Sequence, residues 1–262
     1  MTRVPTLFIA HGSPMSALGA DRLAAGLRQV GERVRGMKAI LAISAHWQTP
    51  EPVRITAWRH AGLVYDFGGF PDELYSLQYP APGDPALAEH VTGLLRASGI
   101  DAVLETRRGL DHGAWVPLRL AWPDAATPVL ELSLPDAPPS RILELGRALR
   151  PLRDEGVLLL GTGGIVHNLG RVRFGAADDA VDDWAASFDG WVASRVAAGD
   201  VESLLRYRSL APHAAEAAPT TEHFDPIFAT LGSAFADEPP VNLLEGFELG
   251  NLSLRSFGFG LD

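Results

Sequence analysis

The feature of this sequence that most limits its fold is a series of short apolar runs, each the length of a β-strand, with helical stretches between several of them. Runs of this kind are typical of strands that are buried on both faces of a sheet. They cover residues 4–10, 39–44, 53–57, 128–133, 157–161 and 253–259. The sequence therefore predicts an α/β fold built around a central sheet.

The segments between these runs have helical periodicity. Asp84 is a suitable N-cap for a helix that opens with Pro85 and ends near Gly99. Further helices are predicted over residues 140–156, 180–198 and 222–231, and the longest loops over residues 67–85 and 211–221. Strands that alternate with helices favour a mixed central sheet flanked by helices, and we expect residues 1–262 to form a single catalytic domain.

Composition excludes several classes of protein. The net charge of -10 and the lack of a basic stripe argue against nucleic acid as a partner. The absence of cysteine excludes disulfides, thiolate metal ligands and a cysteine nucleophile. No apolar stretch approaches the roughly 20 residues that span a bilayer, so we expect a cytoplasmic protein that does not bind membranes.

Three histidines follow apolar runs. His11 comes directly after the first run, His46 comes after the second, and His167 follows the glycine-rich end of the run at 157–161. Ligands in open α/β sheets bind beyond the carboxyl ends of the strands, so these three side chains are expected to converge. A lone histidine at a strand end is more often structural, but a repeated pattern is harder to explain in that way.

Two more histidines lie next to an acid. His112 follows Asp111 and His223 follows Glu222, and a neighbouring carboxylate can hold an imidazole in one tautomer. The remaining three are interpreted as structural or surface residues: His60, His90 and His213. A site rich in imidazole and free of thiolate suits Zn(II), Fe(II), Mn(II) or Cu(II).

Aromatic residues adjoin the histidine segments, and such residues can line a pocket for a planar substrate, although core packing is their commoner role. They are Trp47, Phe67, Phe70, Tyr75 and Trp115. The sequence contains neither a G-x-S-x-G elbow nor an H-E-x-x-H helix, which argues against a serine hydrolase and a zincin.

These segments, taken together, resemble the class III extradiol dioxygenase superfamily, and specifically its short single-chain branch, the 4,5-DOPA dioxygenase extradiol family. The resemblance covers nearly the whole chain. It rests on His11-Gly12-Ser13-Pro14, Ser44-Ala45-His46-Trp47, Asp66-Phe67-Gly68-Gly69-Phe70-Pro71, Tyr79-Pro80-Ala81-Pro82-Gly83, Asp111-His112-Gly113, Val166-His167-Asn168-Leu169 and Glu222-His223-Phe224.

The resemblance implies one divalent metal per chain, which is either Fe(II), the ion that supports ring cleavage, or Zn(II), the ion that some members of the short branch bind. The residues that match the family's ligands are His11, His46 and His223, with Glu222 as an alternative ligand to the last of these. His167 matches a residue that is either a fourth ligand or the catalytic acid/base. His112 matches a catalytic pocket histidine that contacts substrate or oxygen, with Trp47 and Phe67 as further substrate-binding residues.

The activity implied is cleavage of a catechol-type ring, such as that of DOPA, with O2 to a muconic semialdehyde, by a monomer or small homo-oligomer. The metal would bring catechol and O2 together, and His167 would take a catechol proton. Two alternatives stay open from the residues alone: a zinc-dependent hydrolase, and a non-enzymatic binding protein on the same fold.

Overall fold

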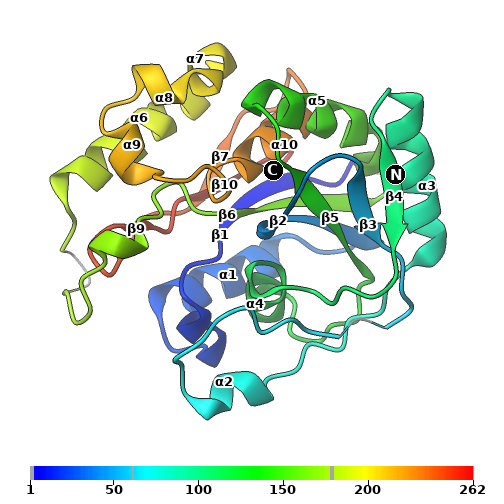
Figure 1. The fold of residues 1–262 in the computed structure, drawn as a ribbon, viewed down its shortest axis with the longest axis horizontal. Helices are drawn as coiled ribbons and strands as arrows, with labels where there is room; N and C mark the ends of the chain where they lie inside the picture. Colours follow the sequence, from blue (N-terminus) through cyan, green and yellow to red (C-terminus); the bar gives the residue numbers. More distant parts are fainter. Residues whose placement is uncertain (1–2, 61, 178–179, 262) are drawn as a thin grey trace.

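The apolar runs form the centre of an eight-stranded mixed sheet in the computed structural model, which describes residues 3–60, 62–177 and 180–261 (Figure 1). The strand order is β4-β3-β5-β2-β6-β1-β10-β7, and β8 and β9 form a separate two-stranded sheet. The strands are β1 (Thr6–Ala10), β2 (Ala39–Thr49), β3 (Val53–Thr56), β4 (Ala102–Glu105), β5 (Val129–Pro135), β6 (Val157–Gly163), β7 (Val241–Leu244), β8 (Phe247–Glu248), β9 (Leu252–Ser253) and β10 (Ser256–Phe259).

The middle of the sheet is parallel. Strand β6 pairs in parallel with both β1 and β2, and β2 pairs in parallel with β5. Antiparallel pairs connect β1 to β10, β10 to β7, and β3 to β5. The predicted α/β fold with a mixed central sheet is therefore confirmed, and the carboxyl ends of β1, β2 and β6 lie at one edge.

Helices cover both faces of this sheet. They are α1 (Arg22–Arg33), α2 (Asp72–Ser76), α3 (Pro85–Ala97), α4 (His112–Ala121), α5 (Pro139–Leu149), α6 (Asp183–Ala197), α7 (Val201–Leu205), α8 (Tyr207–Leu210), α9 (Ala214–Ala217) and α10 (Pro226–Ser233), with short 3-10 turns η1 (Pro14–Leu18), η2 (Arg150–Arg153) and η3 (Leu169–Arg171). None of the helices in the described part of the chain is long and apolar enough to cross a membrane.

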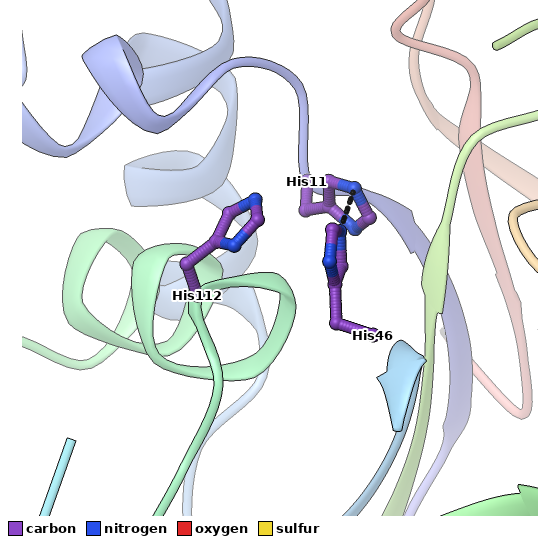
Figure 2. A group of neighbouring side chains, drawn as sticks. All are labelled: His11, His46 and His112. Atoms are coloured by element: carbon purple, nitrogen blue, oxygen red, sulfur yellow. Dashed lines mark hydrogen bonds between the residues drawn. The ribbon is translucent and has the colours of Figure 1, made fainter. Parts of the chain in front are cut away.

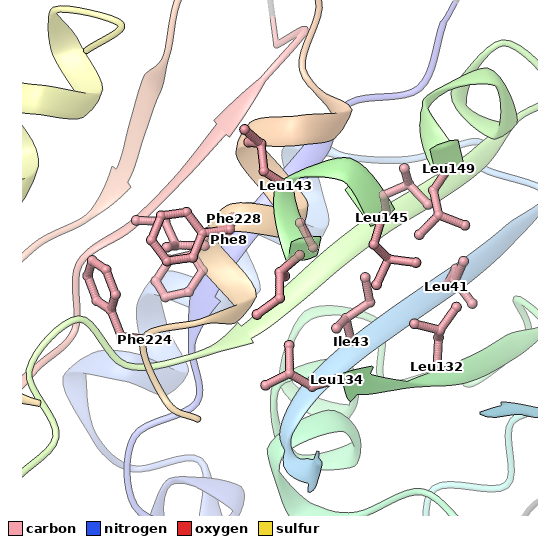
Figure 3. Close-up of a cluster of buried hydrophobic side chains, with 14 of the residues drawn as sticks. Phe8, Leu41, Ile43, Leu132, Leu134, Leu143, Leu145, Leu149, Phe224 and Phe228 are labelled. Atoms are coloured by element: carbon pink, nitrogen blue, oxygen red, sulfur yellow. The ribbon is translucent and has the colours of Figure 1, made fainter. Parts of the chain in front are cut away.

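Alternate residues of the central strands face two separate cores. In β1, Leu7 and Ile9 pack with α1 and α4, whereas Phe8 packs with α5 and α10. Figure 3 shows this second core, where side chains of α5 and α10 lie over those of β1, β2 and β5. Because both faces are buried, the strands read as continuous apolar runs.

The helix predicted after Asp84 is confirmed, since the Asp84 carboxylate accepts a hydrogen bond from the Leu87 N–H at 3.0 Å. The predicted bounds of three others were too wide or shifted, as comparison with α5, α6 and α10 shows. The two predicted loops are not free of structure, because they contain α2 and α9. Helices α1 and α4 were not predicted.

The run at 253–259 is not one strand, which corrects the prediction. It begins in β9 and continues in β10, and these belong to different sheets. The break falls where Ser253 and Arg255 both bond the Asp189 carboxylate of α6, at 2.6 and 2.7 Å. A hydrogen-bonded ion pair in the middle of the run bends the chain away from the sheet.

Candidate active site

The predicted site histidines meet at the edge of the sheet where β1, β2 and β6 end. Figure 2 shows His11 after β1, His46 near the end of β2 and His112 at the start of α4, with the three rings facing one another. One ring nitrogen from each of these three lies within 4.8 Å of the others, and the same holds for His11, His167 and His223. His11 is common to both groups.

The prediction that His46 follows the end of a strand is wrong, because His46 lies within β2. Strand β2 continues to Thr49, and its pairing with β5 shifts register between Ser44 and Gln48. The residues between form a bulge, a feature that redirects side chains next to active sites. Arg108 holds this bulge by donating to the carbonyl of His46 at 3.1 Å.

His11 is buried, and its tautomer follows from its neighbour Thr162 on β6. The Thr162 hydroxyl donates to the carbonyl of Gly113 at 2.6 Å, so its single proton is used there. Its oxygen is 3.3 Å from Nδ1 of His11 and must therefore accept. His11 carries its proton on Nδ1, and its Nε2 presents a lone pair to the site.

One carboxylate serves both His46 and His112. Oδ2 of Asp66 is 3.1 Å from Nδ1 of His46, and Oδ1 is 2.8 Å from Nδ1 of His112. This corrects the interpretation of Asp111 as the partner of His112. Asp111 instead caps α4 and accepts from the Ser44 hydroxyl at 2.7 Å and from Arg108 at 3.0 Å.

His223 has the neighbouring acid that the sequence predicts. Its Nδ1 is 3.0 Å from Oε1 of Glu222, while its Nε2 is buried and has no hydrogen-bond partner among the described residues. The ring of His167 stacks on that of His223, with centroids 3.5 Å apart and planes within 4°. The ring nitrogens of His167 have no hydrogen-bond partner in the described part of the chain.

The backbone of His223 is held against the end of β6. Its carbonyl accepts from the Gly164 N–H at 2.8 Å, and a Cβ on Gly163 would stand only 2.1 Å from that oxygen. On the other side, the fully buried ring of Phe224 packs into the core beside Phe8 and Phe228 (Figure 3). Glycine at 163 thus permits the close approach that brings His223 to the site.

The surroundings favour the neutral imidazole at His11, His167 and His223 and the ionised carboxylate at Asp66 and Glu222. Burial lowers the pKa of His11 well below its usual value, lowers that of His223, and lowers that of His167 to about 2, with neighbouring imidazoles adding to each effect. Burial raises the pKa of Asp66, but hydrogen bonds from His112 and His46 outweigh it and bring that pKa well below its usual range. The hydrogen bond from His223 lowers the pKa of Glu222 to about 2.

This arrangement fits a divalent cation. Neutral imidazoles are the protonation state that ligates metals, and the charges of Asp66 and Glu222 would balance a 2+ ion. Nε2 of His11 and Nε2 of His46 are 3.3 Å apart. Two nitrogens roughly 2.0–2.1 Å from a tetrahedral metal would lie about 3.3–3.4 Å from each other.

The predicted ligand trio is only partly gathered. His11 lies close to both other members, but His46 belongs to the group with His112, and His223 belongs to the group with His167. The ring centroids of His46 and His223 are 5.0 Å apart. Glu222, the predicted alternative ligand, is engaged by His223 and by the Thr220 hydroxyl at 2.8 Å.

The two predicted substrate-binding aromatics lie in different surroundings. Phe67 stands edge-on to His112, with centroids 5.4 Å apart, and belongs to a cluster with Tyr65, Phe70, Tyr75 and Trp115. Trp47 is buried under the guanidinium of Arg108, 4.9 Å from its centroid. It makes no ring contact with a histidine among the described residues.

Asp66 and Thr162 were not predicted as site residues. Asp66 begins the segment Asp66-Phe67-Gly68-Gly69-Phe70-Pro71 on which the family resemblance partly rests, but that segment does not indicate which imidazole the carboxylate would bond. Thr162 is the last residue but one of β6, and its position directly after the apolar run at 157–161 was the one available signal.

Comparison with known proteins places this geometry in a family. Residues 1–245 match the family model described as the catalytic LigB subunit of aromatic ring-opening dioxygenase. The chain belongs to this family. A 4,5-DOPA dioxygenase extradiol of Beta vulgaris is 38% identical over 97% of this chain and 96% of its own length, and one of Escherichia coli K12 is 37% identical over 99% and 96%.

A crystal structure of an uncharacterized protein from Escherichia coli K12 has the same fold as this LigB-family chain. It superposes with a TM-score of 0.82 at 33% identity, and the match covers 98% of this chain and 99% of that one. The predicted family is confirmed, and with it the class of enzyme, an extradiol dioxygenase that opens a catechol ring.

Proposed function

We propose that this protein is a metal-dependent extradiol dioxygenase that opens the ring of a catechol-type substrate, such as DOPA, with O2 to give a muconic semialdehyde. The observation that carries the proposal is that five histidines form two groups sharing His11, one with His46 and His112 and one with His167 and His223, in a chain of the LigB family. The family match favours this activity over the alternatives, a zinc hydrolase or a non-enzymatic binding protein.

In this proposal His11, His46 and His223 hold one divalent metal, Fe(II) in the active enzyme or Zn(II). Each has Nδ1 beside an acceptor, which leaves Nε2 as a lone pair for the cation. The strongest support for a metal ligand is Nε2 of His223, which is buried without a hydrogen-bond partner among the described residues. Burying an unpaired polar atom costs free energy, and a bound cation would remove that cost. The bound metal would supply Lewis acidity and a template for catechol and O2.

His167 is the proposed acid/base. It is the one histidine of the five without a hydrogen-bond acceptor on its ring in the described residues, so it is free to take and release a proton. Burial and neighbouring rings lower its pKa to about 2, which keeps it unprotonated at neutral pH. Negative charge developing on the catechol would favour its protonation and oppose that effect.

His112 is proposed to contact the substrate or oxygen, and because its proton lies on Nδ1 beside Asp66, its Nε2 would accept a hydrogen bond from a catechol hydroxyl. Phe67 stands against the ring of His112 and would pack on the aromatic ring of the catechol. Trp47 packs against the guanidinium of Arg108, which donates to the carbonyl of His46, so Trp47 would help to fix the bulge that carries His46. Phe67 is thus the proposed direct contact with the substrate, whereas the substrate-binding role predicted for Trp47 would be indirect, through the position of His46.

The proposal is tested by loading the protein with Fe(II) without oxygen, adding L-DOPA, and recording oxygen uptake together with the absorbance of the yellow product. One O2 consumed per product formed is the expected result. No uptake over a panel of catechols, with Fe(II) bound, would overturn the proposal.

Single variants separate the roles. His11→Ala and His46→Ala should lose the metal, and His167→Ala should keep the metal and lose turnover. Loss of metal from His167→Ala would make it a fourth ligand instead. The matched control is His90→Ala, because His90 lies on the surface of α3 and pairs with Glu155, so both metal content and turnover should be unchanged.

Three further expectations belong to the proposal: a single catalytic domain over residues 1–262, a cytoplasmic location, and a monomer or small homo-oligomer. Limited proteolysis of the purified protein, cell fractionation, and light scattering of the purified protein test them in turn.

A further inference from the structure

The loop between β3 and α2 carries Asp66 to the histidine cluster, and its backbone is fixed where it does so. The N–H of Val64 donates to the carbonyl of Leu110 at 2.7 Å, and the indole of Trp115 donates to the carbonyl of Val64 at 3.2 Å. Just beyond Asp66, the partly buried ring of Phe67 packs in the aromatic cluster. Asp66 is therefore held from both sides by the residues around α4.

The two oxygens of Asp66 have unequal duties. Oδ1 accepts from the ring Nδ1 of His112 at 2.8 Å and also from its backbone N–H at 3.0 Å. Oδ2 accepts from Nδ1 of His46 at 3.1 Å. An ionised carboxylate can only accept, so both rings carry their protons on Nδ1 and turn Nε2 toward the site.

We propose that Asp66 is a positioning residue that fixes the tautomers of His46 and His112 together, so that one carboxylate sets both the metal affinity and the orientation of the pocket histidine. The inference rests on the proposed function for the metal role of His46. The hydrogen bonds themselves do not depend on a bound metal.

Asp66→Asn separates the two duties. An amide has one accepting oxygen and one donating nitrogen, and the backbone N–H of His112 cannot become an acceptor. The oxygen of the amide should therefore stay on the His112 side, which leaves the NH2 facing Nδ1 of His46. His46 would have to move its proton to Nε2, where it blocks the lone pair, while His112 keeps its proton on Nδ1.

The first measurement is long-range 15N–1H NMR of the histidine rings in the metal-free protein, which reports the tautomer of each ring. We expect Nδ1–H for His46 and His112 in the parent protein, and Nε2–H for His46 alone in Asp66→Asn. An unchanged His46 tautomer in Asp66→Asn would overturn the inference, whatever the activity of the protein.

The second measurement is the zinc dissociation constant, by competition with a chromophoric chelator. Loss of a carboxylate behind a ligating histidine weakens metal binding by about 10–100-fold, and we expect that change in Asp66→Asn. Asp72→Asn, an exposed residue on α2, is the control for the loss of one negative charge and should bind zinc as the parent does.

The outcomes separate this inference from the proposed function. If the parent protein binds no metal but Asp66→Asn still changes the His46 tautomer, the proposed function fails and the positioning role of Asp66 stands. If the parent binds zinc and Asp66→Asn binds it equally well, the proposed link between Asp66 and metal affinity is wrong. Circular dichroism of each variant shows whether it is folded.

Discussion

The turn at the end of β6 allows a direct test of how the fold places His223. A methyl group on Gly163 would stand 2.1 Å from the carbonyl oxygen of His223, whereas one on Gly164 would meet nothing nearer than 3.7 Å. Ordinary contact begins at 3.4 Å, so Gly163→Ala requires a shift of 3.4 − 2.1 = 1.3 Å. Because the obstacle is backbone, we expect the whole His223 turn to move.

The magnitude follows from two effects. Overpacking a tight site costs about 1–3 kcal/mol. The shift also strains or breaks the bond from the Gly164 N–H to the His223 carbonyl, and a buried donor left unpaired costs about 1–3 kcal/mol. Together we expect Gly163→Ala to lower the free energy of unfolding by about 2–6 kcal/mol, and the displaced ligand to raise the zinc dissociation constant at least about tenfold.

Urea denaturation followed by circular dichroism measures the first effect, and competition with a chelator measures the second. Gly164→Ala adds the same methyl group one residue further on and should stay within about 1 kcal/mol of the parent, with its metal affinity unchanged. If the two alanine variants behaved alike in both assays, the close approach of His223 to β6 would not be what holds the site together.

Three other predictions follow from buried charges and from metal linkage. Burial, and then the charge of Asp111, raise the pKa of Glu131 well above 4.5, so the folded protein loses stability as the pH rises from that value toward the raised pKa. Glu131→Gln has no such loss, so its urea midpoint should rise relative to that of the parent between pH 5 and pH 8. A difference in midpoint that stays constant over this range would contradict the prediction. Arg153 is fully buried and pairs with Glu238 at 2.7 Å, so Arg153→Ala should lower the free energy of unfolding by about 3–5 kcal/mol, against less than about 1 kcal/mol for the more exposed Arg3→Ala. Zinc at 100 times its dissociation constant should stabilise the protein by about 2.7 kcal/mol in a thermal melt, and an equal effect on His11→Ala would place the bound metal elsewhere.

Local sequence was enough where a signal acts over a few residues. The buried strands were found because both faces of the sheet are covered, and the helix after Asp84 was found because its cap and apolar face are adjacent in the chain. Helix α1 has comparable signals, with Asp21 capping it and Leu23, Leu27 and Val30 on one face, and it could have been predicted. Helix α4 could not, because it is buried nearly all round and contains Pro117.

The sequence by itself determined the family, the fold class and the five histidines that the structure brings together, because motifs and strand ends are local features. It did not determine how each ring is oriented. Adjacency pointed to Asp111 as the partner of His112, whereas the carboxylate of Asp66, 46 residues away, accepts the hydrogen bond from the Nδ1–H of His112. Only the tertiary structure placed Asp66 between His46 and His112, and Thr162 beside His11, because a hydrogen bond depends on distance in space and these partners come from separate strands and loops.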